Sequence, residues 1–105
     1  MDHITRIIDG RRYNTATAEL VARLTCKAYR VDFGWHDTGL YRTRAGTWFL
    51  AGDGAAASMW AKAAHGGGTI GGCGIRPIPA DEARDVLERE DAQEALERYF
   101  DIEEA

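Results

Sequence analysis

The chain has 105 residues, which suits one domain spanning residues 1–105 and leaves little room for a second. It is 45% hydrophobic and 29% charged, as globular proteins are, and no apolar run approaches the roughly 20 residues that a membrane-spanning helix needs. The first ten residues lack the long apolar core of a signal peptide. We therefore expect a cytoplasmic protein with no membrane partner.

The charge is divided between the two parts of the chain. Residues 80–105 hold 11 acidic side chains and three Arg, a net of −8, whereas residues 1–79 hold 6 acidic and 10 basic side chains, a net of +4. Such asymmetry can mark a surface that binds a partner. The alternative is that the C-terminal helices simply present a solvated charged face.

The N-terminal third predicts a short hairpin and then a helix. Residues 4–8 read as a strand, the dipeptide Asp9-Gly10 as a turn, and residues 11–13 as a second short strand. Residues from about 15 to 26 are expected to form a helix, because their apolar side chains fall at helical spacing. These apolar side chains are Ala16, Leu20, Val21 and Leu24.

The centre of the expected fold is a β-hairpin at residues 40–50 (LYRTRAGTWFL), which has strand-forming residues on both sides of a short connection that contains Gly46. Before it, Val31, Phe33 and Trp35 alternate with polar or small residues, which is typical of a half-buried strand.

After the hairpin, the Ala-rich residues 55–65 favour a short helix, and the glycines of residues 66–74 favour a mobile loop. Residues 75–78 read as a last strand, which Pro77 confines to the edge of a sheet.

The acidic C-terminal residues predict helices. Ala83, Val86 and Leu87 form an apolar stripe, and Asp91 with Glu94 resembles a capping box for a last helical segment. The expected fold class is therefore α+β: a small antiparallel sheet built on the central hairpin and packed with an N-terminal helix, a short middle helix and acidic C-terminal helices.

Motifs for catalysis are weak throughout. Residues 65–68 read HGGG, as in the oxyanion-hole segment of some esterases, but no G-x-S-x-G nucleophile elbow accompanies them. Cys26, Cys73 and the histidines lack the close spacing of zinc ligands, and reduced thiols are favoured over a disulfide. A His36 flanked by carboxylates leaves acid–base chemistry as a minor alternative. We expect no enzyme, no metal and no cofactor.

Two surfaces are candidates for binding. On the hairpin, Arg42 and Arg44 are expected to share one face of a strand, beside aromatic residues that suit nucleic acid or protein. On the C-terminal helices, carboxylates are available to a basic partner. The acidic candidates are Asp85, Glu88, Asp91 and Glu94. Alternatively, the Arg side chains pair with the chain's own acidic helices.

Four segments resemble a family of small proteins from phages and other bacterial mobile elements. They are RYNTATAE (residues 12–19), TGLYRTRAGTWFL (38–50), GDGA (52–55) and IRPI (75–78) before the acidic helix. Family members carry a Y-[ND]-T-x-T-A-E helix start, an L-Y-[RK]-T-x-x-G-x-[WF]-F-L hairpin and a G-[ED]-G-[GA] turn. The chain departs from this pattern at Ala80, where members have a polar cap.

The resemblance carries no catalytic residue to this chain. It implies a phage or mobile-element protein in the cytoplasm of a bacterial host, similar in character to anti-CRISPR proteins. The expected partner is a bacterial host protein complex, a CRISPR effector above all. The alternative is a nucleic-acid-associated accessory protein that uses the Arg and aromatic face, and a homodimer is a further option.

Overall fold

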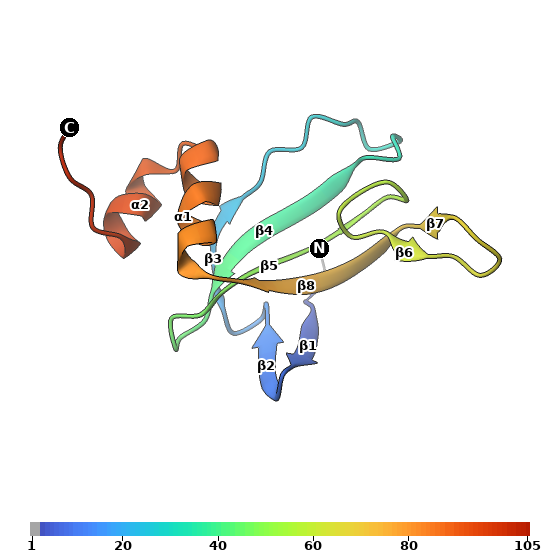
Figure 1. The fold of residues 1–105 in the computed structure, drawn as a ribbon, viewed down its shortest axis with the longest axis horizontal. Coiled ribbons are helices and arrows are strands. Elements are labelled where there is room, and N and C mark those ends of the chain that lie inside the picture. The colour runs from blue at the N-terminus through green and yellow to red at the C-terminus, as the bar shows by residue number, and fades with distance from the viewer. Residues whose placement is uncertain (1–2) are drawn as a thin grey trace.

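The computed structural model describes residues 3–105 as an α+β fold with eight strands and two helices (Figure 1). The strands are β1 (Thr5–Ile8), β2 (Arg11–Asn14), β3 (Glu19–Arg23), β4 (His36–Arg42), β5 (Trp48–Gly54), β6 (Lys62–Ala63), β7 (Thr69–Ile70) and β8 (Gly72–Ile78), and the helices are α1 (Ala80–Arg89) and α2 (Gln93–Tyr99). Four strands form the main antiparallel sheet in the order β3-β4-β5-β8, while β1-β2 and β6-β7 are separate hairpins.

The predicted central hairpin is confirmed as β4 and β5, the two inner strands of the main sheet. Its register places Leu40 opposite Leu50 and Tyr41 opposite Phe49. Because side chains alternate along a strand, the first pair lies on one face of the sheet and the second on the other. The hairpin therefore supplies both faces with buried side chains.

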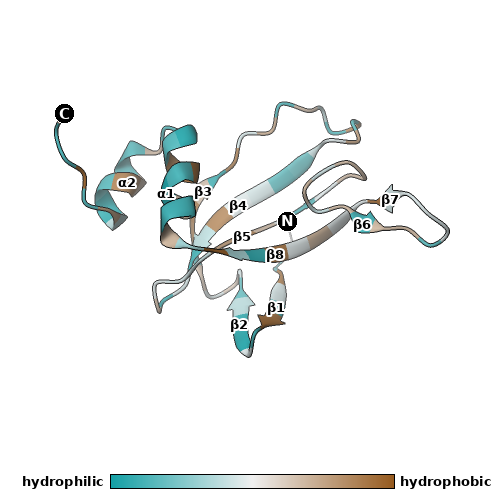
Figure 2. Ribbon diagram, in the orientation of Figure 1, coloured by the Kyte–Doolittle hydropathy of each residue, from teal (hydrophilic) through white to brown (hydrophobic). Residues whose placement is uncertain are grey.

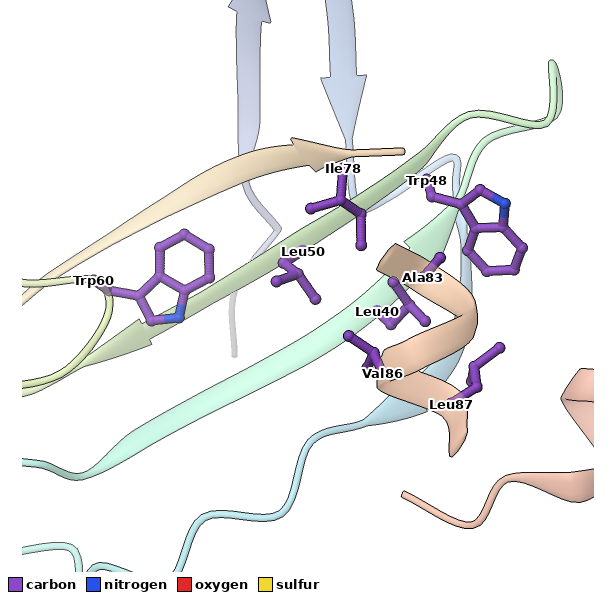
Figure 3. Close-up of a cluster of buried hydrophobic side chains, with 8 residues drawn as sticks. All are labelled: Leu40, Trp48, Leu50, Trp60, Ile78, Ala83, Val86 and Leu87. Carbon is purple, nitrogen blue, oxygen red and sulfur yellow. The ribbon is translucent and has the colours of Figure 1, made fainter. Parts of the chain in front are cut away.

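Helix α1 covers the Leu40 face. Its predicted stripe is confirmed, since Ala83, Val86 and Leu87 are buried against this face of the hairpin (Figure 3). The other members of this cluster are Leu40, Trp48, Leu50, Trp60 and Ile78. The outward residues of α1 are charged, and hydrophilic colour dominates both helices in Figure 2.

The β1-β2 hairpin covers the opposite face, as its position below the main sheet in Figure 1 indicates. Tyr13 of β2 packs edge-on against Phe49 with ring centroids 5.5 Å apart, and Tyr41 stacks on Phe49 at 5.3 Å. Edge-to-face and offset pairs are the favoured arrangements for aromatic rings. The sheet thus lies between a segment from the N-terminal part and a helix from the C-terminal part of the chain.

The predicted N-terminal helix is wrong, because residues 19–23 form strand β3 at an edge of the sheet. The register between β3 and β4 shifts between Leu20 and Ala22, which marks a β-bulge. A bulge adds one residue and breaks the two-residue period of a strand. The apolar residues at 20, 21 and 24 consequently imitate helical spacing.

Two further predictions between the elements of the main sheet are wrong. Residues 29–35 form consecutive turns instead of a strand, and residues 55–65 form turns and strand β6 instead of a helix. In the second segment, Trp60 is buried over the sheet, and its indole Nε1 donates a hydrogen bond to Thr38. This tertiary contact outweighs the helix propensity of the neighbouring alanines.

The predicted last strand is confirmed as the C-terminal part of β8, which is an edge strand as Pro77 requires. The expected glycine loop at residues 66–74 is shorter than predicted, because it contains β7 and the first residues of β8.

The C-terminal helices are confirmed, and a break separates them between Glu90 and Ala92. The predicted capping box is wrong. Asp91 adopts a left-handed conformation with φ of 53°, and its carboxylate accepts a hydrogen bond from the Gln93 side chain at 3.2 Å. Residue 92, an alanine, takes the N-cap position, so Asp91 makes the turn instead of capping the helix.

Candidate functional site

Helix α2 is attached to the sheet mainly through its C-terminal turn. Tyr99 packs edge-on against Trp48 at 5.4 Å, and Phe100 stacks on the same indole at 5.6 Å. The Arg42 guanidinium lies 4.8 Å from the centre of the Tyr99 ring, a cation–π contact. Ala92, Ala95 and Leu96 also pack against the core cluster, and an opening remains between α2 and β3.

This opening is a groove with about 960 Å³ of space, which we call the acidic groove. One wall is β3 and the other is the α1–α2 turn with α2. Its lining consists of Glu19, Leu20, Val21, Asp91, Ala92, Gln93, Glu94, Ala95, Glu97, Arg98 and Tyr99. Four carboxylates and one guanidinium give the groove a net charge of −3.

The carboxylates of the acidic groove differ in whether they already have a hydrogen-bond or ion-pair partner. Glu19 accepts hydrogen bonds from the Tyr99 hydroxyl and from Arg98, the latter at 3.4 Å. Glu94 and Glu97 are exposed on α2, three residues apart and therefore on one side of the helix. No ion pair involving either of them is found within residues 3–105. These two carboxylates are available to a basic ligand.

The groove also has an apolar component. Leu20 is 41% exposed at its wall, and the half-buried Val21, Ala92 and Ala95 line it. A ligand that combines positive charge with an apolar or aromatic side chain would satisfy both features. Tyr99, whose ring packs against Trp48, also lines the groove.

The pKa of Tyr99 is altered mainly by its hydrogen bond to Glu19. The bond raises the pKa of Tyr99 above its ordinary value of 10.0, and burial adds to the effect. The neutral hydroxyl is therefore retained into more alkaline solution than in a free tyrosine. Tyr99 acts as a donor that holds Glu19 in place.

The structure brings together only some of the acidic residues that the sequence singled out. Asp91 and Glu94 line the groove. Asp85 and Glu88 are exposed on α1, outside the groove, and extend the negative surface. Sequence reasoning missed Glu19 and Leu20 of β3, which also line the groove. Glu19 contacts Arg98, which is 79 residues away in the sequence.

The predicted arginine pair is not on one face of a strand. Strand β4 ends at Arg42, and Arg44 is exposed in the following turn. Arg42 is half-buried over the rings of Trp48 and Tyr99. Arg42 therefore packs against the protein's own aromatic rings, while Arg44 remains available to a partner.

The alternative that the basic body pairs with the acidic helices is not what the described residues show. The two ion pairs found among residues 3–105 are Arg23–Asp37 at 2.9 Å and Arg98–Glu19 at 3.4 Å. Neither joins an Arg of the first 79 residues to a carboxylate of the helices.

The residues weighed for catalysis and metal binding take local roles. His36 Nδ1 lies 2.8 Å from the Thr38 hydroxyl, and the Asp32 carboxylate accepts the backbone N–H of Tyr29 at 2.9 Å. Cys26 and Cys73 are free thiols. Within residues 3–105 no group of three or more His, Cys, Asp or Glu is placed to hold a metal ion. The same residues contain no helix that is long and apolar enough to cross a membrane.

Comparison of the chain with protein-family models, with curated proteins and with solved structures finds no match in any of the three. Function is therefore inferred from the residues of the chain itself.

Proposed function

We propose that the chain is a non-enzymatic phage or mobile-element protein that inhibits a bacterial CRISPR effector complex by binding it. In this proposal the acidic groove holds a basic segment of the effector's nucleic-acid channel. The single observation that carries the proposal is the groove itself, with unpaired Glu94 and Glu97 beside an exposed Leu20.

The chemistry of the groove selects the partner. Proteins that hold nucleic acid do so with Arg and Lys side chains that contact phosphates, often with aromatic side chains between them. Such a surface offers positive charge that complements the carboxylates of the groove and apolar groups that suit its exposed Leu20. Occupying it would remove the phosphate contacts that the effector needs.

The exposed carboxylates on α1 extend this role beyond the groove. Asp85 and Glu88 do not line the groove, but they carry the same charge on the neighbouring helix. Complementary charge around an interface mainly raises the association rate, and salt weakens that effect. Reversing these residues should slow association more than it speeds dissociation.

A second candidate function is nucleic-acid association through a basic surface. Its support is the Arg11 guanidinium, which donates a hydrogen bond of 3.0 Å to the Thr47 hydroxyl and so lies at the turn that carries Arg44. Arg12 is exposed on the same hairpin as Arg11. In this alternative, Arg11, Arg12 and Arg44 form the basic surface, and Arg42 is not part of it.

The first test is binding of the full chain to a purified CRISPR effector complex, with phage growth in immune cells as the functional readout. We expect co-elution and restored phage growth. Glu94→Lys with Glu97→Lys should weaken binding at least about tenfold, because like charges brought together at an interface cost several kcal/mol. Glu104→Lys, in the exposed tail outside the groove, is the matched control.

Absence of binding to effector complexes together with absence of rescue would refute the inhibitor proposal. The second test measures binding of the chain to single-stranded DNA and RNA at low salt. Binding that falls steeply with salt and is lost in Arg11→Ala with Arg44→Ala would favour the second candidate. No binding at low salt would eliminate it.

A further inference from the structure

Among residues 3–105, the most exposed large apolar residues lie in one loop, residues 29–35, which we call the aromatic loop. Tyr29 is 79% exposed, Val31 91% and Phe33 75%. A protein surface tolerates single exposed apolar residues, but three large ones in one loop indicate a binding site.

The backbone of the aromatic loop is held in place. The N–H of Asp32 donates to the Tyr29 carbonyl at 2.8 Å, and the carbonyls of Phe33 and Trp35 accept hydrogen bonds from residues 57 and 55 at 2.7 and 2.8 Å. The exposed side chains are thus presented on an ordered backbone, which lowers the entropy lost on binding.

Residues 29–35 hold one cation, Arg30, and one anion, Asp32, and Lys27 just before them gives residues 27–35 a net charge of +1. Lys27 and Arg30 are exposed, and the Arg30 guanidinium lies 4.5 Å from the centre of the Trp35 ring. The carboxylate of Asp32, the acidic residue of the loop, accepts a hydrogen bond from the Tyr29 N–H. The aromatic loop therefore combines basic and apolar side chains, the combination that the acidic groove requires.

Within one chain, the far part of the aromatic loop is held away from the acidic groove. The Thr25 N–H and hydroxyl donate to Glu90 Oε1 at 2.8 and 2.7 Å. The segment that precedes the loop is therefore held against the end of α1. The hydrogen bonds from Phe33 and Trp35 then fix the far part of the loop beside residues 55–57. In Figure 1, which has the longest axis horizontal, α2 lies at one end and this part of the loop lies towards the other.

We infer that the aromatic loop of one copy docks in the acidic groove of a second copy, so that the chain self-associates head to tail. Phe33 or Tyr29 would pack against Leu20, while Lys27 and Arg30 would face the unpaired carboxylates of α2. The partner surface differs from the surface that binds it, so the contact is heterologous and leaves one loop and one groove free at the ends.

This inference rests on the same groove as the proposed function but not on the same partner. If both hold, self-association and effector binding compete for the groove, and dilution of the protein frees it. The effector assay and the self-association assay therefore fail independently.

The experiment is sedimentation velocity of the full chain over a wide concentration range. We expect the average mass to rise above that of one chain as concentration increases. A loop variant, Val31→Ser with Phe33→Ser, and a groove variant, Glu94→Lys with Glu97→Lys, should each remain monomeric. Their controls are Ile7→Ser, which removes an apolar side chain that is 66% exposed on β1, and Glu104→Lys.

Mixing the two variants is the decisive measurement. The loop variant keeps its groove and the groove variant keeps its loop, so the mixture should form a complex of one copy of each and nothing larger. A groove variant that still self-associates would indicate loop-to-loop pairing and overturn the inference. A wild-type chain that is monomeric throughout would overturn it as well. Loss of self-association in the loop variant with effector binding retained would separate this inference from the proposed function.

Discussion

The indole Nε1 of Trp60 donates a hydrogen bond of 2.8 Å to the hydroxyl of Thr38, a side chain that is only 1% exposed. This bond fixes the turn segment 55–61 across the open part of the sheet face that α1 does not reach. The same hydroxyl lies 2.8 Å from His36 Nδ1, so a short polar chain runs from the buried indole to the half-buried imidazole.

Replacing Trp60 with Phe should lower the free energy of unfolding by about 1–3 kcal/mol, because a buried hydrogen bond and some packing are lost. Urea denaturation measures this change. In a double-mutant cycle with Thr38→Val the two effects should be less than additive, because one interaction is lost in both variants. Strict additivity would show that the bond contributes nothing.

Gly52 of β5 cannot accept a side chain. A Cβ there would meet the Asp37 carbonyl and would lie 2.8 Å from Trp60 Nε1. Gly52→Ala should therefore destabilise the fold by about 1–3 kcal/mol or more through overpacking. Gly34→Ala is the matched control, since its Cβ has only the Ala28 methyl at 4.0 Å, and it should be neutral or slightly stabilising in thermal unfolding.

Substitution of the two hairpin arginines, Arg42 and Arg44, should affect the stability of the fold to different extents. Arg42→Ala removes cation–π contacts with Trp48 and Tyr99 and should cost about 1 kcal/mol of stability. Arg44→Ala, in the exposed turn, should change stability by less than about 0.5 kcal/mol. Equal effects in chemical denaturation would contradict the packing role given to Arg42.

The stability of the fold should fall in alkaline solution because two tyrosines, Tyr99 and Tyr41, lose their protons there. The hydrogen bond to Glu19 raises the pKa of Tyr99, and burial raises the pKa of Tyr41, both from an ordinary value of 10.0. Their contribution is fully present below pH 10.0, where native and unfolded chains are both protonated, and is lost as pH rises through the native pKa values.

Tyr99→Phe should make this alkaline decline shallower. Urea midpoints measured at neutral pH and above pH 10.0 test this expectation, and phenolate absorbance reports the titration directly. An unchanged alkaline slope in Tyr99→Phe would show that the Glu19 bond does not govern the titration.

The central hairpin and the C-terminal helices could be predicted because their signals are local. Strand-forming residues flank a turn at Gly46, whose φ of 89° suits glycine, and the stripe of α1 follows a simple helical period. Strand β3 could not be predicted in this way, because a bulge at residues 20–22 alters the period that identifies a strand.

The candidate site was only half predictable for a different reason. Asp91 and Glu94 belong to a stretch whose charge is visible in the sequence, whereas Leu20 and Glu19 join them only because the chain folds β3 beside α2. For the aromatic loop, the sequence pattern predicted burial that the structure does not have. Alternation at Val31 and Phe33 predicted a half-buried strand, but these side chains are exposed because turns replace the strand.

The two faces of the main sheet are covered by segments from opposite parts of the chain, and this has a consequence for biosynthesis. A ribosome produces the β1-β2 hairpin first, so the Phe49 face can close as soon as β5 appears. The Leu40 face must wait for α1, because this helix follows all four strands of the main sheet in the chain. Until then the growing polypeptide exposes Trp48 and Leu50 to solvent, as a target for chaperones. A polypeptide that ended before residue 80 would keep this face open permanently.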